Sequence, residues 1–168
     1  MEEVNEKKIK SIVSKVEINE LMSRYEMMLD HYDMDAIEDH IMDFLDIFTE
    51  NCVIDYEGYP PLEGKDEYGE FLMDYYTGDT TIVDCFHFAA NPVIEVNNDT
   101  ASGQWNFFGP YTYKEVGAAW HFSWYDNKFK RVNGEWKIDR ITLTTKYKSP
   151  YQVGWKETPI AEELTNNS

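Results

Sequence analysis

The half of the chain from residue 80 to residue 147 alternates apolar runs with turn signals, and this pattern predicts a series of β-strands. The strands are expected near residues 82–90, 92–97, 101–113, 117–131 and 135–147. Residues 97–99 predict one turn. The segment "VNGEW" at 132–136 places Asn-Gly between two runs, the dipeptide most typical of a two-residue hairpin. Strands joined by short turns pair antiparallel, so we expect an antiparallel sheet here.

The first third of the chain is instead helical in pattern. One set of apolar residues recurs at helical spacing: Ile9, Ile12, Val13 and Val16. A second set does so too: Ile18, Leu21, Met22, Tyr25, Met28, Leu29 and Tyr32. The phase slips between the two sets, which predicts a break near residues 14–17. A second helix is expected over residues 35–48, a short strand over 51–58 and a short helix over 65–76.

Helices followed by antiparallel strands indicate the α+β class. A strongly curved sheet wrapped against N-terminal helices forms a cone, and its open mouth suits a small-molecule pocket. No internal repeat or Gly/Ser linker divides the sequence. We therefore expect one domain over residues 1–168, with residues 148–168 as a C-terminal arm.

Charge and hydropathy exclude several kinds of partner. The net charge of −17 argues against nucleic acid, which is bound mostly through Lys and Arg, and against anionic membrane surfaces. No segment approaches the roughly 20 apolar residues of a membrane span, and no apolar signal-peptide core is present. We expect a cytoplasmic protein in which Cys52 and Cys85 are reduced thiols.

Several short motifs point to a family. They are "RYEMMLDHYD" (24–33), "VIDY" (53–56), "FH" (86–87), "ASGQW" (101–105) and "VNGEWKI" (132–138). Over about residues 15–150 they resemble the SnoaL-like group of the nuclear-transport-factor-2-like superfamily, and within it scytalone dehydratase and the bacterial bile acid 7-alpha-dehydratases. The last motif is widespread in the superfamily and indicates only the fold. The resemblance implies a cone-shaped α+β barrel that forms a homo-oligomer, either a trimer or a dimer.

The resemblance also implies three catalytic residues. Tyr25, Asp30 and His87 fall where bile acid dehydratases have a tyrosine, an aspartate and a histidine. Histidine suits a general base because its neutral form is available near pH 7. The competing interpretation is that His87, in the apolar run 80–92, is a buried residue satisfied by a hydrogen bond, and that Tyr25 is an ordinary core aromatic.

Further residues are implied to contact the substrate. Tyr32, Asp33 and Tyr56 fall where scytalone dehydratase has substrate-activating tyrosines and a helix aspartate, and Ser123 falls at its pocket serine. Strand alternation then brings His121 and Tyr125 to the same face as Ser123. On the preceding strand, one face is expected to carry Trp105, Phe107, Gly109 and Tyr111.

The sequence departs from the family at two of these positions. Gly109 stands where bile acid dehydratases have the acid that partners the histidine, and Tyr111 stands where scytalone dehydratase has a second histidine. We expect His121 or Tyr111 to supply what Gly109 lacks. The alternative for His121 is a place at the sheet rim or in a subunit contact.

No cofactor or metal is expected. Asp30, Asp33 and Asp35 fail the spacing of a calcium loop, and no Cys/His set has zinc-ligand spacing. Cys85 lies two residues before His87 and is expected on the same strand face. We interpret it as a small buried hydrophobic residue rather than a nucleophile.

The function expected is a cofactor-independent dehydratase that acts on a small hydrophobic polycyclic or aromatic hydroxy-ketone. His87 takes the acidic proton, while tyrosines and Asp30 activate the carbonyl and the leaving hydroxyl. One alternative is a polyketide cyclase or ketosteroid isomerase that uses a carboxylate base. Another is a non-catalytic binding or assembly module. The other strand face, with Trp120, Phe122 and Trp124, is a candidate subunit contact.

Overall fold

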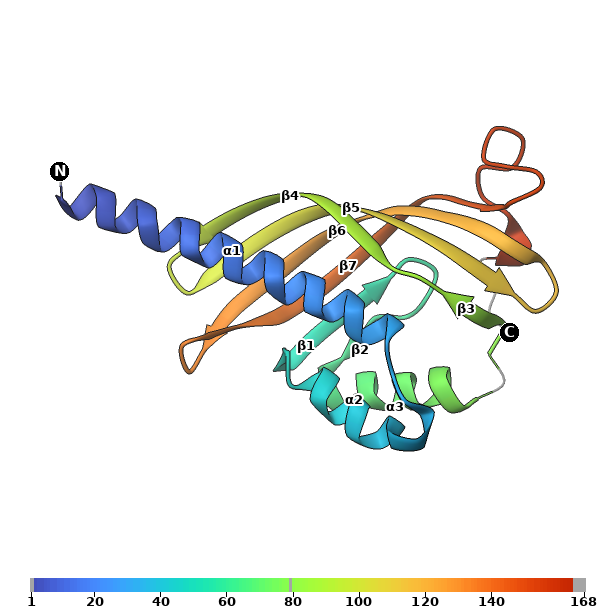
Figure 1. Cartoon of the computed structure of the whole chain (residues 1–168), viewed down its shortest axis with the longest axis horizontal. Coiled ribbons are helices and arrows are strands. Elements are labelled where there is room, and N and C mark those ends of the chain that lie inside the picture. The colour runs from blue at the N-terminus through green and yellow to red at the C-terminus, as the bar shows by residue number, and fades with distance from the viewer. Residues whose placement is uncertain (1, 79, 165–168) are drawn as a thin grey trace.

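Helices cover one side of a strongly curled sheet in the computed structural model, which describes residues 2–78 and 80–164 (Figure 1). The helices are α1 (Glu2–Asp30), η1 (Met34–Ala36), α2 (Ile37–Leu45), α3 (Gly64–Thr77) and η2 (Glu162–Leu164). Helix α1 packs against strands of the long sheet, and α3 packs against the first strand with α2 beside it. The fold is the α+β cone expected.

Seven strands form one sheet. They are β1 (Phe48–Tyr56), β2 (Leu62–Glu63), β3 (Ile82–Cys85), β4 (Phe88–Asn97), β5 (Thr100–Tyr113), β6 (Gly117–Val132) and β7 (Glu135–Pro150). Their order is β2-β1-β7-β6-β5-β3, and β4 also pairs with β5. Asn133 and Gly134 both have positive φ between β6 and β7, which confirms the predicted hairpin.

The sheet is mixed rather than wholly antiparallel, because β1 pairs parallel to β7. Only strands joined by a short turn are forced into opposite directions. The chain passes through α3 and five other strands between β1 and β7, so the relative direction of β1 and β7 is free of that constraint.

The break predicted near residues 14–17 is wrong, since α1 is one continuous helix. Ile18 and Met22 are buried against the sheet, whereas Ile9, Ile12 and Val16 are exposed. In Figure 1 the first turns of α1 extend past the β4–β5 turn, where no strand lies beneath them. The slip in phase therefore marks a change in which helix face is apolar, not a change in the backbone.

The strand expected over residues 82–90 is interrupted at His87. Strand β3 ends at Cys85 and β4 begins at Phe88. The backbone N–H of His87 donates to both carboxylate oxygens of Asp30, at 2.9 and 3.2 Å. One turn earlier on α1, Glu26 Oε2 accepts from the backbone N–H of Ala89 at 2.7 Å. Two acids of α1 thus anchor the segment that carries His87.

The C-terminal arm folds back on the sheet as far as it is described. Lys148 forms a parallel bridge with Ile160, and Ala161 and Leu164 are buried against Tyr113. Among the described residues, none of the helices has the length and apolar character needed to cross a bilayer.

Candidate active site

A cavity of about 550 Å³ opens between the helices and the inner face of the sheet. Its walls come from α1, α3 and the strands, and aromatic side chains dominate them. Six of the catalytic and substrate-contacting residues expected from the sequence line it: Tyr25, Tyr56, His87, Tyr111, His121 and Tyr125. The cavity is large enough for a small ring compound.

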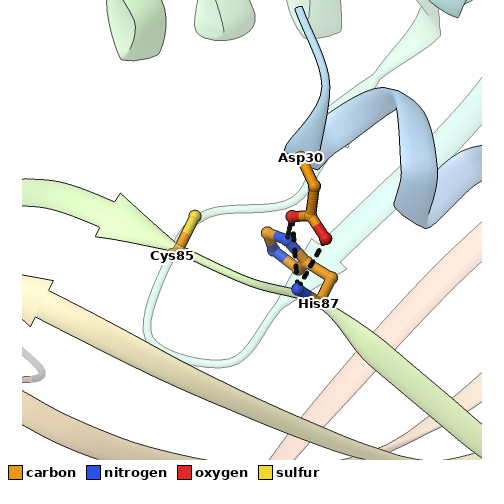
Figure 2. Close-up of side chains that lie close together, drawn as sticks. All are labelled: Asp30, Cys85 and His87. Atoms are coloured by element: carbon orange, nitrogen blue, oxygen red, sulfur yellow. Dashed lines mark hydrogen bonds and ion pairs between the residues drawn. The ribbon is translucent and has the colours of Figure 1, made fainter.

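The His87 imidazole is held between an acid and a phenol. Asp30 at the end of α1 points at His87, and its Oδ1 lies 2.6 Å from Nδ1 (Figure 2). On the other side of the ring, the Tyr111 hydroxyl lies 3.2 Å from Nε2. Burial raises the pKa of Tyr111, so this hydroxyl stays protonated and donates. The proton then resides on Nδ1, which faces the Asp30 carboxylate, and the lone pair of Nε2 accepts from the Tyr111 hydroxyl.

The contact between Tyr111 and His87 requires a residue without a side chain at position 109, which is Gly109. A Cβ at residue 109 would lie 2.6 Å from Tyr111 Cε2 and 2.9 Å from both Phe107 Cζ and the Phe86 carbonyl oxygen. The volume in which the resemblance places an acid is therefore filled by two aromatic rings. Of the two substitutes expected, Tyr111 is the one bonded to His87.

Three tyrosine hydroxyls form a chain in the cavity wall. The hydroxyls of Tyr25 and Tyr56 are 2.8 Å apart, and those of Tyr56 and Tyr68 are 2.9 Å apart. Burial raises the pKa of all three, which keeps them as hydrogen-bond donors. Tyr68 lies on the buried face of α3, and its sequence pattern is that of any core aromatic, so sequence reasoning missed it.

The other wall of the cavity carries a neutral histidine. His121 Nε2 lies 2.8 Å from Ser123 Oγ and 3.1 Å from Thr145 Oγ1. Burial, with the nearby charge of Lys148, lowers the pKa of His121 to about 3. His121 thus has a place in the cavity rather than at the rim. Lys148, which also lines the cavity, was not singled out from the sequence.

Two residues expected at the substrate lie outside the cavity. Tyr32 is exposed and packs on Tyr76, with ring centroids 4.4 Å apart. Asp33 caps η1 by accepting from the backbone N–H of Asp35 at 3.0 Å. Helix α1 ends at Asp30, so Tyr32 and Asp33 lie in the segment between α1 and η1 and not in the cavity wall.

Three further residues support the cavity from behind. Trp105 is buried and donates from Nε1 to Asn19 Oδ1 at 3.2 Å. Phe107 contacts both histidine rings, with centroids 5.7 Å from His87 and 5.4 Å from His121. Ser123, as described, holds His121. These side chains position the lining residues rather than forming the surface.

A metal ion has one conceivable set of ligands among the described residues. Ligand atoms of Asp30, Cys85 and His87 lie within 4.8 Å of one another, and Figure 2 shows Cys85 beside the pair. Asp30 and His87 already satisfy each other in a direct hydrogen bond. Burial raises the pKa of the Cys85 thiol to about 11, and its sulfur lies 3.3 Å from the Tyr75 hydroxyl. This chemistry favours a hydrogen-bonded dyad with a neutral thiol nearby.

The chain is similar to a known domain family and to several solved structures. A family model described as a SnoaL-like domain matches residues 10–142. No curated protein sequence is significantly similar to the chain. A candidate scytalone dehydratase from Novosphingobium aromaticivorans is 23% identical, with a TM-score of 0.69 over 85% of this chain and 91% of that chain.

Two other solved structures have the same fold. Hexachlorocyclohexane dehydrochlorinase LinA-type3 from Novosphingobium barchaimii is 18% identical, with a TM-score of 0.68 over 83% of this chain and 90% of that chain. A cystatin-like protein from Nostoc punctiforme is 20% identical, with a TM-score of 0.60 over 79% and 91%. At these identities the likeness concerns the fold alone. Because the family model matches most of its length, this chain belongs to the SnoaL-like domain family.

Proposed function

We propose that the protein is a cofactor-independent lyase that removes water from a small hydrophobic hydroxy-ketone of ring type. The observation that carries this proposal is the 2.6 Å contact between His87 Nδ1 and Asp30 Oδ1, in a pair whose side chains are 12% and 5% exposed. A carboxylate that holds one ring nitrogen fixes the orientation of the imidazole and stabilises the imidazolium formed when the other nitrogen takes a proton.

His87 is a better base than Asp30 in this site. Both Asp30 oxygens accept hydrogen bonds from His87, through the backbone N–H and through Nδ1. Moving Asp30 to a substrate proton breaks these bonds, whereas His87 Nε2 only has to exchange its Tyr111 contact for the substrate. This arrangement speaks against the carboxylate-base chemistry of the cyclase or isomerase alternative.

The tyrosine chain supplies donors for the charge that develops. As Nε2 takes the proton next to the carbonyl, the C–H electrons move into a carbon–carbon bond and the carbonyl oxygen becomes negative. A hydroxyl of the Tyr25–Tyr56–Tyr68 chain donates to that oxygen. The enolate then expels the β-hydroxyl, which takes a proton from the imidazolium and leaves as water.

Two relatives lend this reaction class support. Their names denote a dehydratase and a dehydrochlorinase, and both words describe an elimination. The cavity walls, rich in tyrosine with Leu29, Leu72 and Leu143 among them, suit a flat apolar ligand.

The test combines a substrate panel with two variants. We would incubate the protein with a steroid enone, a hydroxy-ketosteroid thioester and a naphthol-type hydroxy-ketone, and follow products by mass spectrometry. A product lighter by one water is expected. His87→Gln should lower kcat/KM by about a thousandfold, and Asp30→Asn by about a hundredfold, because a general base contributes on this scale. His31→Gln, an exposed histidine outside the cavity, is the matched control and should stay within about twofold.

The same experiment separates the alternatives. A product of unchanged mass would replace dehydration by isomerisation or cyclisation. Dehydration by His87→Gln at the wild-type rate would show that the His87–Asp30 pair is not the general base. Tight ligand binding in both the wild type and His87→Gln, with turnover in neither, would identify a binding module.

A further inference from the structure

Lys148 is a half-buried cation without an anionic partner among the described residues. It lies on β7, opposite His121 in the register of β6 and β7, and it lines the cavity. Its Nζ lies 5.6 Å from the centroid of the Tyr113 ring, and no carboxylate of the described residues forms an ion pair with it. Lys137 on the same strand bonds the Asp46 carbonyl oxygen at 2.7 Å and its carboxylate at 3.3 Å. Lys137 thus has an acidic partner, whereas Lys148 on the same strand has none among the described residues.

The missing partner is unexpected in so acidic a chain. The sequence carries 32 Asp and Glu residues, and burying an ammonium without a counter-charge costs free energy. Burial lowers the pKa of Lys148 to about 8, so the side chain is still mostly protonated at pH 7. A solitary, partly desolvated charge in a cavity is typical of a functional site.

His121 adds a second unsatisfied group beside the ammonium. Its Nδ1 is buried and has no hydrogen-bond partner among the described residues. Its Nε2 is held by the hydroxyls of Ser123 and Thr145, at 2.8 and 3.1 Å. The paired strands β6 and β7 therefore bring together an ammonium and an imidazole nitrogen, and neither has a hydrogen-bond partner among the described residues.

We propose that Lys148, with His121, forms a subsite for a carboxylate carried by the ligand of this cavity. The Tyr111 ring contacts both His87 and His121, at centroid distances of 5.9 and 5.4 Å, so the subsite adjoins the dyad. The ligand class is a flat apolar ring acid whose carboxylate sits near the ring carbon held at His87. This inference rests on the proposed use of the cavity as a substrate site, but not on the elimination itself.

Binding of an unreactive acid tests the subsite separately from turnover. We would measure the affinity of 2-naphthoate and of uncharged 2-naphthamide by calorimetry at pH 7. The wild type should prefer the acid by about tenfold, on the scale of a charge-assisted hydrogen bond. Lys148→Met should lose this preference while keeping its affinity for the amide. Lys146→Met, an exposed lysine two residues away, is the control and should keep the preference.

A second measurement uses the unmodified protein. From pH 7 to pH 10 the preference for 2-naphthoate should disappear, because Lys148 loses its proton. Of its neighbours, His121 stays neutral and Tyr113 stays protonated over this range, since burial shifts their pKa values away from it. The cavity carboxylates Glu57 and Asp74 are present in every variant. Equal binding of acid and amide by the wild type, no detectable binding of the acid, or an unchanged preference in Lys148→Met would each overturn the proposal, whether or not the protein is a lyase.

Discussion

Glu26 illustrates how one residue both supports the site and costs stability. Its Oε2 accepts from the Ala89 backbone N–H, but its Oε1 is buried with no partner among the described residues. Burial raises the pKa of Glu26 to about 7, with a smaller contribution from the charge of Asp30. Near neutral pH the folded protein therefore has to bury a carboxylate that water would otherwise solvate.

The resulting pH dependence has a definite sign. Because the pKa is higher in the folded state than in the unfolded state, the stabilising effect of the proton is complete at low pH and is lost as the pH rises through about 7. The contribution of Glu26 to the free energy of unfolding should fall by about 3 kcal/mol between pH 4 and pH 8. Urea denaturation of Glu26→Gln should show a flatter pH profile and greater stability at pH 8 than the wild type.

An exposed acid provides the comparison for this variant. Glu38→Gln on α2 should follow the wild-type pH profile. Parallel profiles for the wild type and Glu26→Gln would mean that Glu26 is not the titrating group.

At the scale of one element, Gly109 of β5 leaves the space that Tyr111 needs to contact His87. Residue 109 has no room for a Cβ because the rings of Tyr111 and Phe107 occupy that space. Gly109→Ala should therefore displace Tyr111 from His87 and destabilise the fold by about 1–3 kcal/mol, the usual cost of overpacking. Chemical denaturation measures the loss, and NMR of the His87 ring reports the lost contact.

A smaller neighbouring side chain should relieve this strain. Combining Gly109→Ala with Phe107→Leu is expected to cost less than the sum of the two single changes, since the shortened side chain makes space for the methyl group. Strict additivity would show that the crowding at residue 109 is not the cause.

At the scale of the whole molecule, the convex face of the sheet is unusually aromatic. Phe108 packs on Trp120 and Phe122, and Trp155 of the arm packs on Phe122. Trp124 on the same face is 43% exposed. An aromatic surface of this kind is typical of protein contacts, which keeps the expectation of a homo-oligomer, a trimer or a dimer.

Native mass spectrometry of two variants tests this surface. The wild type should appear as an oligomer, and Trp124→Glu should shift it toward monomer because a carboxylate is costly to bury in an apolar contact. Met42→Glu, at an apolar residue on α2 that is 64% exposed, should leave the assembly unchanged. A wild type that is monomeric throughout would contradict the expectation.

Local chemistry explains the parts of this protein that could be read from the sequence. Alternation separated His121, Ser123 and Tyr125 from Trp120, Phe122 and Trp124, and the burial of β6 follows that pattern. Asn133-Gly134 defined the hairpin through backbone preferences that act within four residues. The motif at residues 86–87, read through the resemblance, also led to His87.

The remaining features depend on segments that meet only in the folded chain. Asp30 and His87 are 57 residues apart, and their contact needs both the end of α1 and the gap between β3 and β4. Periodicity reports that one side of α1 is apolar but not whether a sheet lies beneath it, so the exposed first half was misread as a break. Tyr68 and Lys148 look like an ordinary core aromatic and a surface lysine in sequence. Only tertiary packing, which sets what each side chain faces and how much water it loses, makes them part of the cavity.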